Sequence, residues 1–164
     1  MRPSWSKDGR WIYFSSNRSG DWQIWKAPAQ GGGAVQITKV SGGHEPFESF
    51  DAKYVYYAKF GTSGIFNTPV EGGEETRVLD QAGESGWALT TEGICFFDLR
   101  NPASIALKFY NFATSKTTLL KQFPRDTRVD RDSTALSVSA DGLWILYTQL
   151  DQSGSDLILV ENYR

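Results

Sequence analysis

Residues 4–14 read SWSKDGRWIYF, and a close copy, SVSADGLWILY, follows at residues 137–147. Two weaker copies lie between them, ESFDAKYVYY at residues 48–57 and ALTTEGICFF at residues 88–97. In the two outer copies, Asp-Gly stands between apolar runs, which is a strong hairpin signal because glycine accepts the positive φ that such a turn needs. The sequence therefore predicts one hairpin that recurs four times along the chain.

The spacing of the copies indicates the architecture. Trp11, Tyr54, Ile94 and Trp144 mark one position in the four copies and are 43, 40 and 50 residues apart. Periods of about 40–50 residues are typical of propeller blades, each of which is a four-stranded antiparallel sheet. We therefore predict an all-β fold, a β-propeller of four blades within one domain, with approximate bounds at residues 2–39, 40–80, 81–123 and 124–164.

The last repeat is shorter than the others. It offers three strand-like runs before residue 164, so the sequence predicts a three-stranded last blade. Propeller rings commonly close when one blade takes a strand from the opposite end of the chain, and no spare strand precedes residue 3. We expect these blades to be half of a larger ring of about 7–8 blades. Two alternatives are closure of the four blades on themselves and a homodimer that closes one ring.

Composition excludes several functional classes. The chain has 164 residues, 40% hydrophobic and 22% charged, which is the balance of a soluble globular domain. A net charge of −2 and a pI of about 5.4 argue against nucleic-acid binding by this region. No apolar run approaches the ~20 residues that span a membrane. The single cysteine, Cys95, stands in an apolar strand, so we expect a buried, inert thiol; a reactive thiol is the alternative.

The residues that carry catalysis in common enzyme classes are scarce. A Ser-His-Asp site or a structural zinc site needs histidines and cysteines, and the chain has one of each, His44 and Cys95. The sequence thus predicts no enzyme activity, no metal site and no cofactor. His44 and Glu45 fall in SGGHEPFES, where we expect a connection that enters a strand. A solvated loop position is the expected interpretation of His44, and a ligand contact at the mouth of the ring and a catalytic base are the alternatives.

A second group of candidates comes from charged and aromatic residues near expected turns. The segment RDTRVDRD, residues 125–132, interleaves acids and bases without calcium-loop spacing, so charge compensation or a ligand-facing loop is expected. The aromatics that recur on the second strand of each repeat are expected to be core, whereas Trp22 follows a turn and is expected to be partly exposed. The predicted ligand- or partner-binding residues are Arg18, Trp22, His44, Glu45, Arg125, Arg128 and Asp130.

The pattern P-x-W-S-x-D-G-x-x-I-x-F-x-S, followed by G-D-x-x-I-W and a Gly-Gly turn, resembles the TolB-like, WD-repeat-like propeller repeat. The residues that carry the resemblance are Pro3, Trp5, Ser6, Asp8, Gly9, Ile12, Phe14, Ser16, Gly20, Asp21, Ile24, Trp25, Gly31 and Gly32, and in the last repeat Ser137, Ser139, Asp141, Gly142, Ile145 and Tyr147. Ala52 and Glu92 depart from the pattern at the turns of the middle copies. The resemblance implies a periplasmic or extracytoplasmic location; without it, a cytoplasmic one is expected.

The last repeat is also similar to the C-terminal end of large bacterial signalling proteins, in which a winged-helix or Ser/Thr kinase domain precedes a TolB-like propeller. This similarity implies further blades and an effector domain upstream of the present residues. The predicted function is therefore a non-enzymatic interaction or sensory module that binds a protein segment or ligand at the ring mouth. The alternative is the gating propeller of a prolyl-oligopeptidase-like hydrolase.

Overall fold

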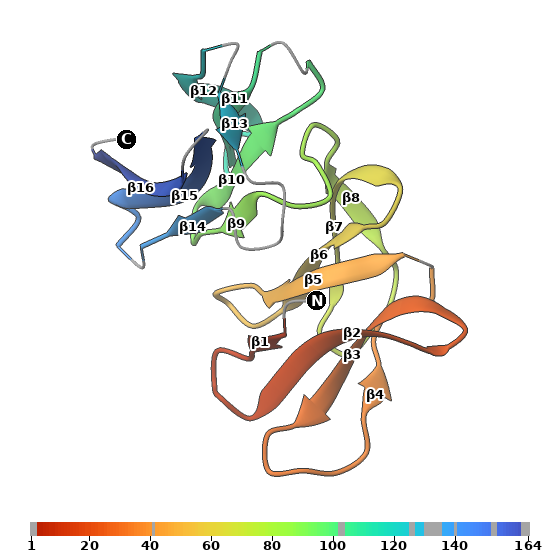
Figure 1. Ribbon diagram of the computed structural model, residues 1–164. Coiled ribbons are helices and arrows are strands. Elements are labelled where there is room, and N and C mark those ends of the chain that lie inside the picture. The colour runs from red at the N-terminus through yellow and green to blue at the C-terminus, as the bar shows by residue number, and fades with distance from the viewer. Residues whose placement is uncertain are drawn as a thin grey trace. The chain divides into compact units, whose positions relative to one another are not determined.

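The structure, a computed structural model, describes residues 3–40, 42–101, 104–124, 127–129, 136–139, 141–151 and 154–161, with side chains up to residue 150. These residues form sixteen β-strands and no helix (Figure 1). The chain divides into two compact units, Met1–Asp80 and Gln81–Arg164. Each unit contains two antiparallel sheets and is described by itself.

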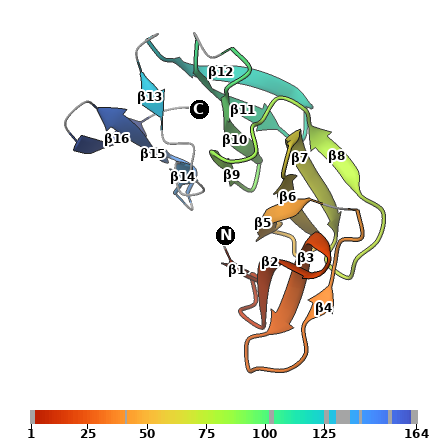
Figure 2. The ribbon, with the colours of Figure 1, turned by 45° about the vertical axis from the view of Figure 1, so that its right-hand side comes forward.

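The first unit holds two four-stranded sheets in which consecutive strands are neighbours (Figure 2). The first sheet has the order β1 (Ser4–Trp5), β2 (Trp11–Ser19), β3 (Asp21–Pro28) and β4 (Val35–Gln36). The second has the order β5 (Gly43–Glu48), β6 (Tyr54–Lys59), β7 (Thr62–Pro69) and β8 (Thr76–Leu79). Meanders of this kind follow from short hairpin turns between successive strands.

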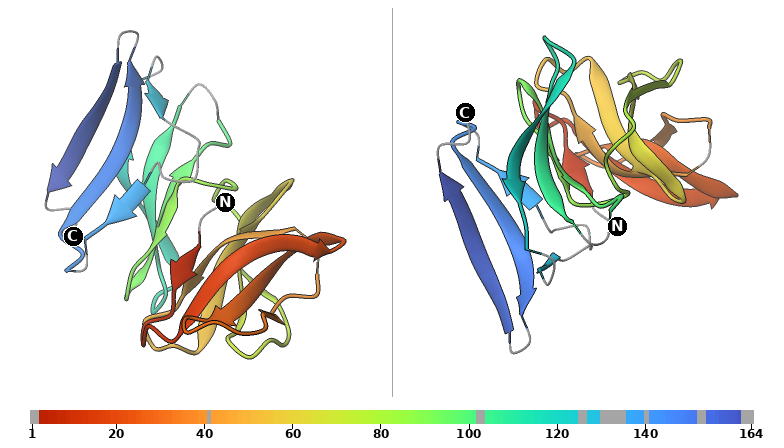
Figure 3. Two further views of the ribbon diagram at one scale, coloured as in Figure 1. Left: turned by 60° about the horizontal axis from the view of Figure 1, so that its bottom comes forward. Right: turned by 90° about the horizontal axis from the view of Figure 1, so that it is seen from above.

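The second unit repeats the scheme with a difference in its last sheet. The third sheet consists of β9 (Trp87–Leu89), β10 (Gly93–Asp98), β11 (Ala106–Asn111) and β12 (Lys116–Gln122). The fourth contains β13 (Arg128–Val129), β14 (Leu136–Val138), β15 (Trp144–Asp151) and β16 (Gly154–Glu161). Strand β16 pairs along the full length of β15, so β13 and β14 share the other edge of β15 and the sheet is three strands wide (Figure 3). The predicted all-β fold with a three-stranded last blade is confirmed.

One hydrogen-bond pattern builds the hairpin turn in three of the four sheets. A serine Oγ accepts from the backbone N–H five residues later, at 2.8–3.0 Å, and donates to the aspartate two residues later, at 2.5–2.7 Å. The aspartate in turn accepts the backbone N–H two residues beyond itself, at 2.9–3.2 Å. The serines are Ser6, Ser49 and Ser139. Because all partners lie within six residues, this turn is specified locally by the sequence.

The turn of the third sheet is tighter. Thr90 takes the place of the serine, but its Oγ1 accepts from the N–H of Gly93, three residues later, at 3.0 Å. Leu89 pairs with Ile94 in the third sheet, just as Trp5 pairs with Ile12 in the first. Ile94 is therefore equivalent to Ile12. The residue equivalent to Trp11 is Gly93 and not Ile94, as the repeat alignment predicted. The sequence alignment was therefore wrong by one residue here, and in a strand a shift of one residue moves every side chain to the opposite face.

Each unit has its own apolar core between its two sheets. In the first unit the core joins residues of β2, β3 and the following segment to residues of β6 and β7, namely Tyr13, Ile24, Ile37, Val55, Tyr57 and Phe66. In the second unit Cys95, Phe97 and Leu107 of the third sheet meet residues of the fourth, including Leu136, Ile145 and Tyr147. Cys95 is buried, as predicted, and burial raises its pKa to about 12.

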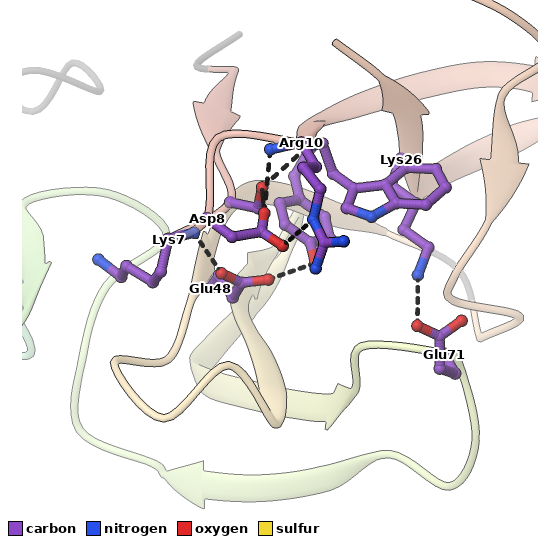
Figure 4. Close-up of polar contacts among 9 residues, drawn as sticks. Lys7, Asp8, Arg10, Lys26, Glu48 and Glu71 are labelled. Atoms are coloured by element: carbon purple, nitrogen blue, oxygen red, sulfur yellow. Dashed lines mark hydrogen bonds and ion pairs between the residues drawn. The ribbon is translucent and has the colours of Figure 1, made fainter.

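Polar contacts link the two sheets of the first unit at the end that carries the Asp-Gly turn (Figure 4). Glu48 accepts the backbone N–H of Lys7 at 2.5 Å and the hydroxyl of Tyr13 at 2.7 Å. Buried Lys26 donates to the carboxylate of Glu71 at 2.9 Å. Within the turn, hydrogen bonds from the Ser6 hydroxyl and then from Arg10 lower the pKa of Asp8 to about 2. These contacts give the carboxylates of Asp8, Glu48 and Glu71 partners within the first unit.

Candidate functional site at an aromatic corner

Three aromatic side chains of the first unit gather at the end of the sheets opposite the turns that contain Asp8 and Asp51. Trp22 is the second residue of β3, Phe60 follows β6 directly, and His44 is the second residue of β5. The Phe60 ring stacks on the His44 ring at 4.2 Å between centroids, and Trp22 approaches Phe60 at 5.6 Å in a tilted geometry. We call this group of Trp22, His44 and Phe60 the aromatic corner.

Backbone hydrogen bonds hold the aromatic corner in place. The N–H of Gly42 donates to the carbonyl of Trp22 at 2.8 Å, and the N–H of Phe60 donates to the carbonyl of Gly42 at 2.9 Å. The segment that connects β4 to β5 is therefore hydrogen-bonded at Gly42 to Trp22 in the first sheet and to Phe60 in the second. These bonds fix the backbone of the corner independently of any ligand, which is a property of preorganised binding sites.

His44 and Glu45 lie in strand β5 and not in a solvated connection. His44 is 6% exposed and Glu45 is buried as well, so the interpretation of His44 as a solvated loop residue is wrong. The physical reason is a β-bulge, because the pairing of β5 with β6 shifts between His44 and Phe47. Glu45 sits in this bulge at φ 52°, a left-handed conformation that side chains rarely adopt.

The exposed surface of the aromatic corner belongs mainly to Phe60, which is 44% exposed, whereas Trp22 is half-buried as expected. A phenyl ring supported on one face by a buried imidazole and flanked by an indole presents a rigid apolar surface. Such a surface can bind an apolar or aromatic side chain, because little conformational entropy remains to be lost. The His44 ring is used for stacking and is buried, which suits packing better than proton transfer to a substrate.

The remaining predicted residues do not join this corner. Arg18 lies over the rings of Phe14 and Trp25, at 5.1 and 5.0 Å from their centroids. Arg128 is exposed on β13 in the second unit. Arg125 and Asp130 lie outside the described residues. Phe60 was missed by sequence reasoning, although its position directly before the Gly61 turn is the same kind of signal that singled out Trp22.

A separate hollow of about 520 Å³ opens on the third sheet. Asp98 in its wall accepts hydrogen bonds from Arg100 at 2.8–2.9 Å and from Lys108 at 2.8 Å. The side chain of Arg100, and then that of Lys108, lower the pKa of Asp98 far below its usual range, against the opposing effect of burial. Because Asp98 is shared by two cations, Arg100 and Lys108, the cluster is accounted for as a structural ion-pair network with an excess of positive charge.

Two further kinds of feature, a metal-binding group of side chains and a membrane-spanning helix, were sought among the described residues. No group of three His, Cys, Asp or Glu side chains there is placed to hold a metal ion. In the same residues, no helix has the length and apolar character that crossing a membrane requires.

Comparison with known proteins begins with sequence. No protein-family model matches the chain. An uncharacterized protein of Agrobacterium fabrum, Atu1656, is 32% identical over 82 residues, which are 49% of this chain and 28% of that protein. The chain thus spans well under two thirds of the length of this relative.

Solved structures resemble nearly the whole chain. TolB from Acinetobacter baumannii matches with a TM-score of 0.77 at 17% identity, over 97% of this chain and 40% of that one. A candidate TolB from Agrobacterium tumefaciens matches with a TM-score of 0.79 at 16% identity, over 98% and 61% of the two chains. The similarity extends to a prolyl endopeptidase, with a TM-score of 0.65 at 16% identity over 98% and 28%, and to a nidogen/laminin complex, with 0.70 at 10% identity over 99% and 64%. At these identities the likeness shows the fold, and the fold of this chain is a β-propeller of the kind found in TolB.

Proposed function

We propose that the chain is a non-enzymatic β-propeller interaction module that binds a protein segment through the aromatic corner. The observation that carries the proposal is the Phe60 ring, 44% exposed and stacked on buried His44 beside Trp22. Interface hot spots are enriched in large aromatic residues that sit in preformed surroundings. Phe60 is thus suited to anchor an apolar side chain of a partner.

The backbone around the corner supports a recognition role. Glu45 is held at φ 52° within the β-bulge that precedes Phe47. Left-handed non-glycine residues cost of order 1–3 kcal/mol and cluster at ligand-binding positions. A bulge also re-aims the neighbouring side chain, here that of His44, which gives the Phe60 ring its supporting surface. A scaffold that maintains such a conformation is preorganised for a specific contact.

The wider context is part of the same proposal. The likeness of the fold to a chain of the nidogen/laminin complex supports a role in protein binding. The resemblance of the last repeat to the C-terminal ends of bacterial signalling proteins supports a place in a larger signalling or transcription-regulatory protein. Sequencing the reading frame around this region tests the context directly: a winged-helix or kinase domain is expected, and a chain without an effector domain would refute that part.

A second candidate is the gating propeller of a prolyl-oligopeptidase-like hydrolase, which the likeness to a prolyl endopeptidase favours. Because a propeller only restricts access to a catalytic domain, the present chain should then hydrolyse no peptide ester by itself. It should instead inhibit or gate a separately supplied α/β-hydrolase domain. A search of the same reading frame for a hydrolase domain separates this candidate from the first.

Binding at the aromatic corner is tested with arrays of immobilised peptides, including lipoprotein segments, and with a parallel glycan array. We expect peptide binding that weakens about tenfold or more in Phe60→Ala and Trp22→Ala, since anchor residues dominate such interfaces. Phe50→Ala is a matched control, because Phe50 is also 44% exposed but follows β5 at the opposite end of the sheets. His44 and Glu45 are left unchanged, as both are buried and their replacement would disturb the fold.

The results of the two arrays separate three cases. Selective loss of peptide binding in the two corner variants, with Phe50→Ala unchanged, supports the proposal. Binding that all three variants retain would place the partner surface elsewhere and overturn the site. Binding of glycans alone would reject the protein-segment ligand while leaving the fold assignment untouched.

A further inference from the structure

The hollow of about 520 Å³ on the third sheet is built on one face of that sheet. Asp98 on β10 pairs with Ala106 on β11, and Lys108, two residues further along β11, pairs with Leu119 on β12. Directly paired residues project to the same side of a sheet, as do residues two apart on one strand, so these four side chains share a face. Leu107 projects to the opposite face, where it packs on the fourth sheet. We call this cavity the third-sheet hollow.

The walls of the third-sheet hollow come from one sheet. Every described residue that lines it belongs to β10, β11, β12 or the connection between β10 and β11. The connection contributes Arg100 and Ser104, and β12 contributes Gln122 beside Leu119. Pairing within the third sheet therefore fixes the shape of the hollow, and its chemistry can be derived from these side chains.

The acceptor positions of the Asp98 carboxylate are all occupied. Oδ1 accepts the backbone N–H of Arg100 at 3.2 Å and the Nε–H of the same residue at 2.9 Å. Oδ2 accepts from the Arg100 guanidinium and from Lys108, both at 2.8 Å. A carboxylate has about four acceptor positions, and these contacts fill them. Asp98 thus has no acceptor position left for a cation or for a ligand hydroxyl group.

Hydrogen-bond donors, in contrast, remain available in the third-sheet hollow. The Lys108 ammonium carries three N–H groups, of which one donates to Asp98 and none donates to another described residue. The Lys108 side chain is 23% exposed, so a ligand can reach it. The Ser104 hydroxyl oxygen accepts from Gln122 Nε2 at 2.8 Å, which leaves its hydrogen to donate elsewhere. Gln122 Nε2 also donates to the Ile105 carbonyl at 2.8 Å, so the amide that positions Ser104 is itself held in place.

The charges of the lining favour the same class of ligand. Asp98 is the acid among the described lining residues, and Arg100 and Lys108 are the bases, so the hollow has a net charge of +1 while the whole chain has −2. A carboxylate, with one negative charge, neutralises this excess, whereas a phosphate dianion would reverse it. Leu119 is 54% exposed next to Lys108 and offers a contact for aliphatic carbons.

We propose that the third-sheet hollow binds a ligand that carries a carboxylate on a short aliphatic chain. Lys108 and Ser104 donate to the carboxylate, Arg100 adds positive charge, and Leu119 packs against the aliphatic carbons. A volume of about 520 Å³ is in the range of small-molecule sites. This chemistry can come from a free organic acid or from a glutamate side chain of a partner segment. The site is separate from the aromatic corner and does not rest on the function proposed there.

The test is a titration of the full chain, labelled with ¹⁵N, in which NMR follows the backbone amides of Ser104 and Lys108. Two matched pairs of probes differ in charge but not in shape. They are an acetylated, amidated five-residue alanine peptide with a central glutamate or glutamine, and free butyrate or butyramide. We expect the anionic member of a pair to bind at least about tenfold more tightly than the neutral one. Binding of the glutamate peptide alone supports a partner segment as the source, and binding of butyrate supports a free acid.

Two substitutions should change the affinity in opposite directions. Lys108→Met removes the ammonium and leaves Asp98 paired with Arg100, so carboxylate binding should weaken at least about tenfold. Asp98→Asn removes the competing carboxylate, so binding should tighten about threefold or more, which a purely structural role of these ion pairs does not predict. Lys116→Met is the matched control, because Lys116 is an exposed lysine at the start of β12 that does not line the hollow. It should leave the affinity unchanged.

If Asp98→Asn fails to fold, Ser104→Ala takes its place, because it removes a donor to the ligand without breaking an ion pair and should weaken binding severalfold. Equal affinity for the charged and neutral members of both pairs, or no binding up to about 50 mM, would overturn the proposal. Tighter binding of inorganic phosphate than of either carboxylate would reject the ligand class, and equal effects of Lys108→Met and Lys116→Met would reject the hollow as the site. None of these results involves Trp22 or Phe60, so the aromatic corner is tested separately.

Discussion

Ala52→Gly should stabilise the protein, because Ala52 occupies a turn position that suits glycine. In three hairpins with the same hydrogen bonds, this position is Gly9 at φ 70°, Ala52 at φ 55° and Gly142 at φ 69°. A left-handed conformation costs an L-residue about 1–2 kcal/mol. Glycine loses about 0.5–1 kcal/mol more in backbone entropy when the chain folds. The difference is a net stabilisation of about 0.5–1 kcal/mol.

The reverse change serves as an internal check. Gly9→Ala should destabilise by about 0.5–1 kcal/mol. A Cβ built on Gly9 meets no atom within 4 Å, so this cost is conformational and not steric. Ala27→Gly is the control for glycine entropy alone, because Ala27 lies within β3 and pairs with Ile12 in ordinary strand geometry. It should destabilise by about 0.5–1 kcal/mol.

The measurement is urea unfolding of the three variants and the wild type under identical conditions. The midpoint should rise for Ala52→Gly without a change in slope, and the melting temperature should rise by about 1–4 °C. A lower midpoint for Ala52→Gly, similar to that of Ala27→Gly, would refute the reasoning. It would mean that the turn at residues 49–54 does not hold Ala52 in the left-handed conformation.

Three further predictions follow from buried groups. Tyr13→Phe should lower the free energy of unfolding by about 1–3 kcal/mol, because it removes a donor from the buried carboxylate of Glu48; an unchanged urea midpoint would contradict this. Cys95 should react with a thiol reagent such as DTNB only after unfolding, since it is buried with a pKa raised to about 12; rapid stoichiometric labelling of the native protein at pH 8 would show otherwise. Asp98→Asn should destabilise at neutral pH, because hydrogen bonds from Arg100 depress the pKa of Asp98 in the folded state. That stabilisation is fully present above the unfolded pKa of about 3.9 and is lost as the pH falls toward the lower folded value, so the melting temperatures of variant and wild type should begin to converge below about pH 4.

Much of the fold could be predicted because its decisive signals are local. The Ser-x-Asp-Gly turns close through hydrogen bonds among residues at most five apart, and the turn chemistry is visible in the letters of the sequence. The third repeat escaped correct alignment because its Thr90 turn is two residues shorter, a difference that only strand pairing reveals. A misalignment of one residue hardly changes the length of the repeat, but it assigns every side chain of the strand to the wrong face of the sheet.

The candidate site depended on tertiary structure. The sequence determined that apolar runs alternate with turns in four repeats, that the single cysteine lies in an apolar strand, and that Trp22 follows a turn. The tertiary structure decided that His44 is buried, because a bulge at Glu45 turns the strand, and that Phe60 rests on His44 beside Trp22. It also decided that Trp5 is exposed, because burial in a repeat protein depends on a neighbouring sheet and not on the residue's own strand. Hydrogen bonds within a turn are encoded over a few residues, but contacts between sheets bring together residues from distant parts of the chain, and their geometry exists only once the sheets have packed.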